Sequence, residues 1–210
     1  MKVEEIKTAL KRYGFDNTDP LLTWINAAYH EIESAHGHWS FLELDETIES
    51  ELGEFNLVAS VNRFIKVRDM TTELASGGEG KDLEYMDRRD FMRTFPNALI
   101  AGNPEVFTII GSNKLQVYPD PVGKRKYKVS YIRLLPDLVA DAEEPLIPVK
   151  NHYTIVRGAA YIALQAENEE ERAASAQGQF ESDLDKMISN DQRRQIGEPE
   201  TVVDAQEYSE

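Results

Sequence analysis

The chain has 210 residues, of which 38 are acidic and 23 basic, so its net charge is −15 and its isoelectric point is near 4.7. This excess of acid repels a phosphate backbone and argues against a protein that binds duplex nucleic acid. The absence of cysteine excludes disulfides, thiolate metal sites and thiol nucleophiles. The charged N-terminus predicts no cleaved signal, and no segment has the roughly 18 apolar residues that a membrane span needs.

Two amphipathic helices are predicted at the N-terminal end. Apolar residues spaced by three and four indicate a helix over residues 3 to 13, which Gly14 ends. The pair Asp19-Pro20 is typical of a helix start, so a second helix is expected over about 20 to 36. Four residues of this region are interpreted as core: Trp24, Tyr29, Ile32 and Trp39.

From residue 39 the apolar pattern changes to alternation, which predicts β structure. A Gly-rich segment at 76–81 is interpreted as a flexible connector, and 87–92 as one or two helical turns. We expect six or seven short strands, among them 41–50, 55–59, 64–68, 106–110, 114–118 and 127–134.

Helical periodicity returns after Pro148. Ile155, Ala159 and Ile162 lie on a small-residue face that suits close packing, and we expect it to contact Trp24, Tyr29 and Ile32. A last helix is predicted over roughly 169 to 194.

The fold class that follows is α+β. Residues 1–38 and 148–196 are expected to form a helical bundle, and residues 39–147 a mainly antiparallel, β-rich insertion. Residues 197–210 hold five acids and no base, so we interpret them as a flexible acidic tail that cannot fold alone.

Catalytic chemistry finds little support in the sequence. His30 and His36 are six residues apart and point to different sides of a helix, so no metal ligand is assigned. No phosphate-binding loop or nucleophile motif occurs, so no catalytic residue or cofactor is predicted either. An alternative hypothesis is a small metal-dependent or carboxylate-based hydrolase that uses His30, Glu33 and His36.

Two charged segments are prominent. Lys124 to Lys128 is a basic cluster and the one place where a nucleic acid could bind. We interpret it in preference as a guard of an edge strand at a hairpin tip, or as a protein contact. Residues 39–62 contain six acids and no base, and we expect these carboxylates to face solvent or a channel for DNA. The six are Glu43, Asp45, Glu46, Glu49, Glu51 and Glu54.

Several segments together resemble the head-to-tail adaptor proteins of tailed bacteriophages, including the tail tubular protein A type. The segments are Leu21 to Ile32 with the Trp39-Ser40-Phe41-Leu42 that follows, Asn103 to Thr108, Leu115 to Pro121, Val129 to Tyr131, Pro145 to Pro148, and Ile155 to Tyr161. The resemblance covers residues 18 to 190. It implies a non-enzymatic virion protein at the neck between head and tail, assembled in the host cytoplasm.

The resemblance also implies partners. It implies a dodecameric ring that binds the portal protein after genome packaging and offers a platform to a tail or nozzle protein, while DNA passes through without specific binding. A tail-completion or tail-terminator protein is the alternative. We expect the acidic tail and the end of the last helix to dock on the portal, which makes six residues candidates for the portal or ring interface: Phe180, Leu184, Met187, Ile188, Arg193 and Arg194.

Overall fold

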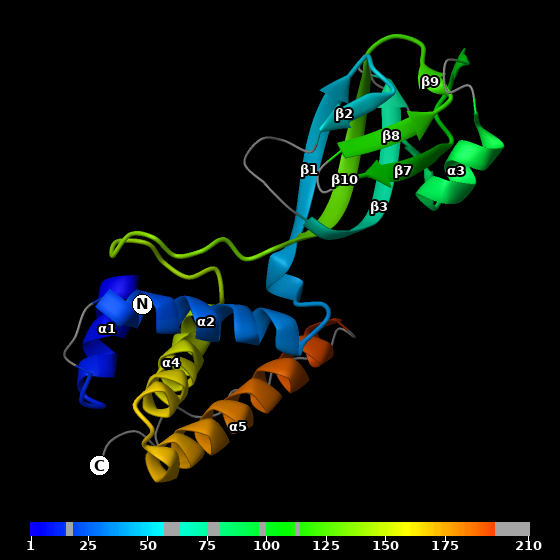
Figure 1. The fold of residues 1–210 in the computed structure, drawn as a ribbon. Helices are drawn as coiled ribbons and strands as arrows, with labels where there is room; N and C mark the ends of the chain where they lie inside the picture. Colours follow the sequence, from blue (N-terminus) through cyan, green and yellow to red (C-terminus); the bar gives the residue numbers. More distant parts are fainter. Residues whose placement is uncertain (16–18, 57–63, 75–79, 97–99, 112–113, 196–210) are drawn as a thin grey trace. The chain divides into compact units, whose positions relative to one another are not determined.

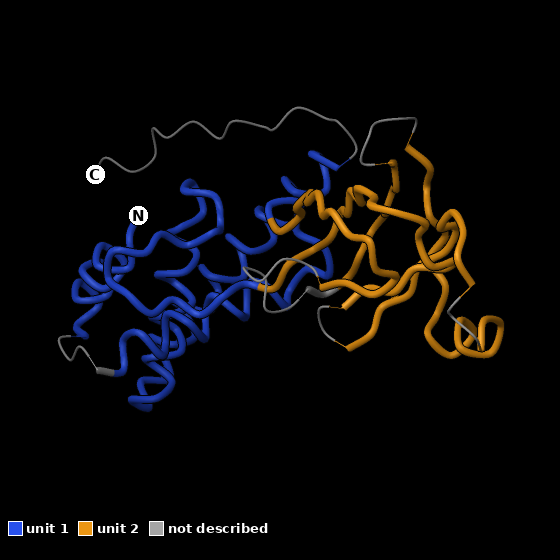
Figure 2. Tube along the Cα trace, turned by 90° about the horizontal axis from the view of Figure 1, so that it is seen from above, with its two compact units in different colours: residues 1–41, 135–210 blue, residues 42–134 orange. Residues whose placement is uncertain are grey.

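The computed structural model describes residues 1–15, 19–56, 64–74, 80–96, 100–111 and 114–195. The chain divides into two compact units, which Figure 2 shows in blue and orange. We call residues 1–41 and 135–210 the helical unit, and residues 42–134 the β unit. Residues 135–147, which the sequence pattern assigned to the insertion, group with the helices instead.

The helical unit contains four of the α-helices in the described residues: α1 (Val3–Lys11), α2 (Asp19–Ala35), α4 (His152–Ala166) and α5 (Glu170–Gln195). A 3-10 turn, η2 (Val149–Asn151), leads into α4. Helix α4 contacts α1, α2 and α5, and Figure 1 shows it between the last two. In the described part of the chain, no helix is long and apolar enough to cross a membrane.

Gly158 on α4 explains how closely these helices approach. A Cβ atom added there would lie 2.8 Å from the Phe180 ring of α5 and 3.0 Å from the Ala28 Cβ of α2. The neighbouring residues Ile155 and Ala159 are fully buried. Small side chains on α4 therefore let two helices pack against it from different sides.

The predicted core residues divide into two groups. Five of them are buried: Tyr29, Ile32, Trp39, Ile155 and Ala159. Trp24 and Ile162 are only half-buried, so they lie at the margin of the core. On α2 the fully buried positions belong to Leu21, Ile25 and Ala28, and the Trp24 ring meets Phe15 edge-on at 5.5 Å.

Hydrogen bonds explain why residues 135–147 join the helical unit. The Asn26 side chain on α2 donates to the Leu138 carbonyl and accepts from the Leu138 N–H, both at 2.9 Å. The Tyr29 hydroxyl accepts from the Leu146 N–H at 2.7 Å, and the Val3 N–H donates to the Glu143 carbonyl at 2.9 Å. An irregular segment is thus held by polar groups that its sequence pattern does not reveal.

The β unit begins after a 3-10 turn, η1 (Ser40–Leu42), and builds two four-stranded sheets (Figure 1). One sheet has the order β1-β10-β3-β4, from β1 (Glu43–Ser50), β10 (Arg125–Arg133), β3 (Phe64–Leu74) and β4 (Lys81–Asp82). The other has the order β2-β8-β7-β5, from β2 (Glu54–Asn56), β8 (Lys114–Tyr118), β7 (Val106–Ile110) and β5 (Glu84–Tyr85).

Pairing in both sheets is antiparallel except between β5 and β7. A further short parallel pair joins β6 (Ala101–Gly102) to β9 (Asp120–Pro121), and the helix α3 (Arg88–Thr94) contacts β7. The predicted α+β class with mainly antiparallel strands is confirmed at this level. Of the predicted strand 55–59, residues 57–59 lie outside the described residues, as do 76–79 of the predicted connector.

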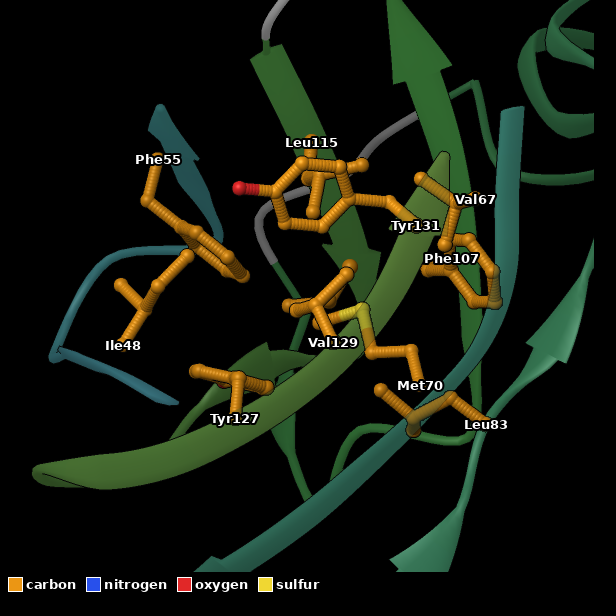
Figure 3. Close-up of a cluster of buried hydrophobic side chains, with 11 residues drawn as sticks. Ile48, Phe55, Val67, Met70, Leu83, Phe107, Leu115, Tyr127, Val129 and Tyr131 are labelled. Atoms are coloured by element: carbon orange, nitrogen blue, oxygen red, sulfur yellow. The ribbon is translucent and has the colours of Figure 1, made fainter. Parts of the chain in front are cut away.

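The core of the β unit lies between its two sheets (Figure 3). Tyr127, Val129 and Tyr131 alternate along β10 and point inward, which is the period-two pattern of a strand with one buried face. The rings of Phe55 on β2 and Tyr127 stack with their centroids 4.6 Å apart, so side chains of both sheets meet in this core.

Candidate interaction surfaces

The acidic strand β1 finds its bases on its neighbours. Glu43 pairs with Arg68 of β3 at 2.7 Å, and Glu49 pairs with Lys124 at 2.5 Å. Asp45 lies 3.6 Å from Lys128 of β10. Hydrogen bonding to Lys124, followed by its charge, lowers the pKa of Glu49 below its ordinary value. The segment lacks bases in sequence, but antiparallel pairing supplies them in space.

The basic cluster 124–128 is therefore a partner of the acidic strand. Strand β10 lies between β1 and β3, so interpreting the cluster as the guard of an edge strand is wrong. In the register of the sheet, Lys126 stands opposite Glu49 on one side and Glu73 on the other. A central strand needs no protection against edge-to-edge pairing, and its lysines instead balance carboxylates on both neighbours.

The apolar face of α5 faces its own unit. Phe180 and Met187 are 2% and 4% exposed, and Leu184 and Ile188 are half-buried. An ion pair between Arg157 of α4 and Asp183 adds a polar contact on the same side. Phe180 and Met187 therefore belong to the subunit core, and the sequence pattern could not distinguish a face that packs internally from one that docks on a partner.

The two arginines near the end of α5 are more accessible. Arg193 is half-buried and Arg194 is exposed. Arg194 also borders a shallow depression next to Trp39, Phe41 and Lys150. The acidic tail that follows, 197–210, lies outside the described residues.

Two carboxylates hold the helical unit where the chain leaves for the β unit and where it returns. Asp191 of α5, which is 5% exposed, accepts hydrogen bonds from the Ser40 N–H at 3.1 Å and the Ser40 hydroxyl at 2.5 Å. Glu33 of α2 accepts from the Leu135 N–H at 2.6 Å. Nearby, the Trp39 indole donates to the Ile32 carbonyl at 2.9 Å and closes the C-terminal end of α2. Sequence reasoning missed the role of Asp191.

The two histidines of the hydrolase hypothesis have different structural partners, and only His30 contacts Glu33. His30 bonds Asp137 at 2.7 Å and Glu33 at 3.1 Å, whereas His36 lies 3.7 Å from Asp191. Burial acts against the charged form of His30, but hydrogen bonds to Asp137 and Glu33 and their charges raise its pKa above the ordinary value. No group of three or more possible ligands suited to a metal ion occurs in the described ranges.

Helix α3 carries a surface that sequence reasoning missed. Phe91 is buried, and the centroid of its ring lies 5.4 Å from that of Phe95 and 6.4 Å from that of Tyr118. The Asp87 side chain accepts from the Arg89 N–H at 2.9 Å and caps the helix. Every other residue of the helix is exposed: Arg88, Arg89, Asp90, Met92, Arg93 and Thr94. The sequence pattern that could have indicated this surface is the grouping of three arginines within residues 88–93, in a chain that is otherwise strongly acidic.

Comparison with known proteins identifies the family of this chain. A family model described as SU10 adaptor protein matches residues 1–203, and no curated protein matches the sequence. The match extends across both units and nearly the whole chain. The chain therefore belongs to the SU10 adaptor protein family, which supports the phage head–tail adaptor role and the virion location that the sequence resemblance implied.

Proposed function

We propose that the chain is a head-to-tail adaptor of the tail tubular protein A type. Twelve copies form a ring that binds the portal protein after genome packaging and offers a platform to a tail or nozzle protein. The observation that carries this proposal is the family match over residues 1–203. Membership in an adaptor family implies a structural, non-enzymatic role.

The division of the chain supports a protein with two attachment sides. Each unit has its own buried core, and the chain passes between the units at residues 41–42 and 134–135. We assign residues 1–38 and 148–196 to a helical bundle that contacts the portal, and the β unit to contact with the tail. Two units with different chemistry suit a connector that must bind two unlike proteins.

The charge balance supports passage of DNA without binding. The β unit has 15 acidic and 13 basic residues, for a net charge of −2, and the remaining 23 acidic and 10 basic residues give the helical unit −13. The strongly acidic helical unit therefore repels phosphate on average, and the nearly balanced β unit offers phosphate little net attraction. We assign contact with the portal to Arg193, Arg194 and the acidic tail, because Phe180 and Met187 of α5 are buried within the subunit.

Co-sedimentation with purified portal rings tests this function. The full-length chain should join portal rings, and a chain truncated after Ile196 should melt at the same temperature but fail to join them. If the full-length chain does not bind portal rings and binds the ends of tail tubes, the protein is a tail-completion or tail-terminator protein. Equal binding by both chains would show that the tail plays no part in assembly.

A further inference from the structure

The bases of the β unit fall into two groups, paired and unpaired. Several bases on the sheets are paired: Lys81 with Glu105 at 2.8 Å and Lys114 with Glu54 at 2.5 Å, like the pairs formed by β1. The three arginines of α3 lack such close ion pairs in the described residues. Arg88 and Arg89 form no ion pair within the described residues, and the single pair of Arg93, with Asp90, is long at 4.0 Å and highly exposed.

Helix α3 presents these guanidinium groups from a fixed support. The buried Phe91 and its aromatic neighbours hold the helix, and Phe95 stacks on Tyr118 with centroids 3.9 Å apart. Met92 on the same helix is 55% exposed, and Tyr85 just before it is 53% exposed. Arginine, methionine and tyrosine are the residue types enriched in protein interfaces, so this surface fits a protein partner.

The helical unit carries a surface of opposite charge where α2 and α5 come together. Glu31 of α2 and Glu181 of α5 are exposed, and no basic side chain pairs with either one in the described part of the chain. Partial burial, followed by repulsion from Glu181, raises the pKa of Glu31 above its ordinary value. The close packing at Gly158, between Ala28 and Phe180, brings these two helices near each other.

We propose that α3 of one copy docks on the surface around Glu31 and Glu181 of a neighbouring copy. Arg88, Arg89 and Arg93 supply the positive charge, and Met92 supplies an apolar contact. Because the two surfaces differ, the contact is heterologous and repeats from copy to copy, as a ring requires. The inference rests on the proposed ring function and specifies which surfaces join its subunits.

Cross-linking inside assembled particles tests the contact. The chain has no cysteine, so the introduced thiol is the only one on each copy of this chain that a short bis-maleimide can link. Ala27 is exposed one turn before Glu31 on α2. Particles made with a mixture of Met92→Cys and Ala27→Cys chains should give a linked dimer. A mixture of Met92→Cys with Thr47→Cys, on the exposed face of β1, is the matched control.

The outcomes separate this inference from the proposed function. Failure of all variants and of the unmodified chain to enter particles contradicts the adaptor function itself. Normal incorporation with no linked dimer above the control contradicts only the α3 contact. A link from Met92→Cys to a portal or tail protein also contradicts it.

Charge reversal gives a second, independent arm. A chain with Arg88→Glu, Arg89→Glu and Arg93→Glu should lose incorporation, and so should a chain with Glu31→Arg and Glu181→Arg. Mixed together, the two should assemble again, because each reversed surface then meets its reversed counterpart. If α3 instead contacts DNA, the arginine variant alone loses function and the glutamate variant cannot rescue it, which overturns the proposal.

Discussion

The helical unit and the β unit use their charged residues differently. In the β unit, with a net charge of −2, acidic and basic residues alternate between neighbouring strands and pair across the sheet. The helical unit, with a net charge of −13, also has ion pairs such as Arg157–Asp183, but its carboxylates Asp191 and Glu33 accept hydrogen bonds from the backbone where the chain leaves the unit and where it returns. The overall charge of −15 therefore describes the helical unit and conceals a nearly balanced β unit.

This difference changes how a charge pattern should be interpreted. A run of acids along one strand says little about the surface until its neighbours are known, because cross-strand partners lie far away in sequence. Isolated carboxylates in helices are the ones that fix the fold or remain available to a partner. The four histidines add to the contrast, since all of them lie in the helical unit.

The largest expected effect is on the two tryptophans of the helical unit. Trp39 is 1% exposed and donates a hydrogen bond, so Trp39→Ala should cost about 3–5 kcal/mol of unfolding free energy. Trp24 is half-buried against Phe15, so Trp24→Ala should cost only about 1–2 kcal/mol. Chemical denaturation, monitored by hydrogen exchange in each unit, measures the loss of unfolding free energy in both variants. Equal losses would place Trp24 in the core after all.

The next largest effect on stability is expected from a comparison of two carboxylates, Asp191 in the helical unit and Glu49 in the β unit. Asp191→Asn should cost about 1.5–3 kcal/mol, because a buried charged acceptor of two hydrogen bonds from Ser40 is replaced by a weaker one. Glu49→Gln should leave the melting temperature unchanged, because its ion pair with Lys124 is exposed and screened. A stronger loss from Glu49→Gln would reverse the comparison.

Two helical glycines should respond with opposite sign. Gly158→Ala should destabilise the helical unit by about 1–3 kcal/mol, because the added methyl meets Phe180 and Ala28. Gly178→Ala on α5 should stabilise it by up to about 1 kcal/mol, since its added methyl would meet nothing within 4 Å and alanine favours the helix. Thermal melting of the two variants decides the matter, and a stable Gly158→Ala chain would contradict the tight packing.

The smallest expected effect is that of pH on the stability of the helical unit, because the contributions of His30 and His152 have opposite sign and partly cancel. Burial lowers the pKa of His152 from 6.5, so its contribution to stability is present above pH 6.5 and is lost as the pH falls below that value. The pKa of His30 is raised, so its contribution is present below 6.5 and is lost as the pH rises through its folded value. His30→Gln should therefore steepen the loss of stability on acidification.

Hydrogen exchange in the two units checks this prediction between pH 5 and 7.5. The described part of the β unit contains no histidine, so its protection should change less than that of the helical unit. A larger change in the β unit would contradict the assignment. An unchanged slope in His30→Gln would show that its bonds to Asp137 and Glu33 carry no net stabilisation.

Local patterns predicted most of the elements. The apolar spacing indicated helices at 3–13 and 20–36, and the structure has them at Val3–Lys11 and Asp19–Ala35. The strands at 106–110 and 114–118 agree to the residue. These signals are local because periodicity and capping depend on neighbours within a few residues.

What the sequence by itself determined is the α+β class, the order of its elements and the adaptor family. Only the tertiary structure decided which faces are covered: Phe180 and Met187 turn inward, the lysines of β10 neutralise β1, and the arginines of α3 stay exposed. The physical reason is that periodicity fixes which side chains share a face, whereas burial and charge pairing depend on segments that are distant in the chain.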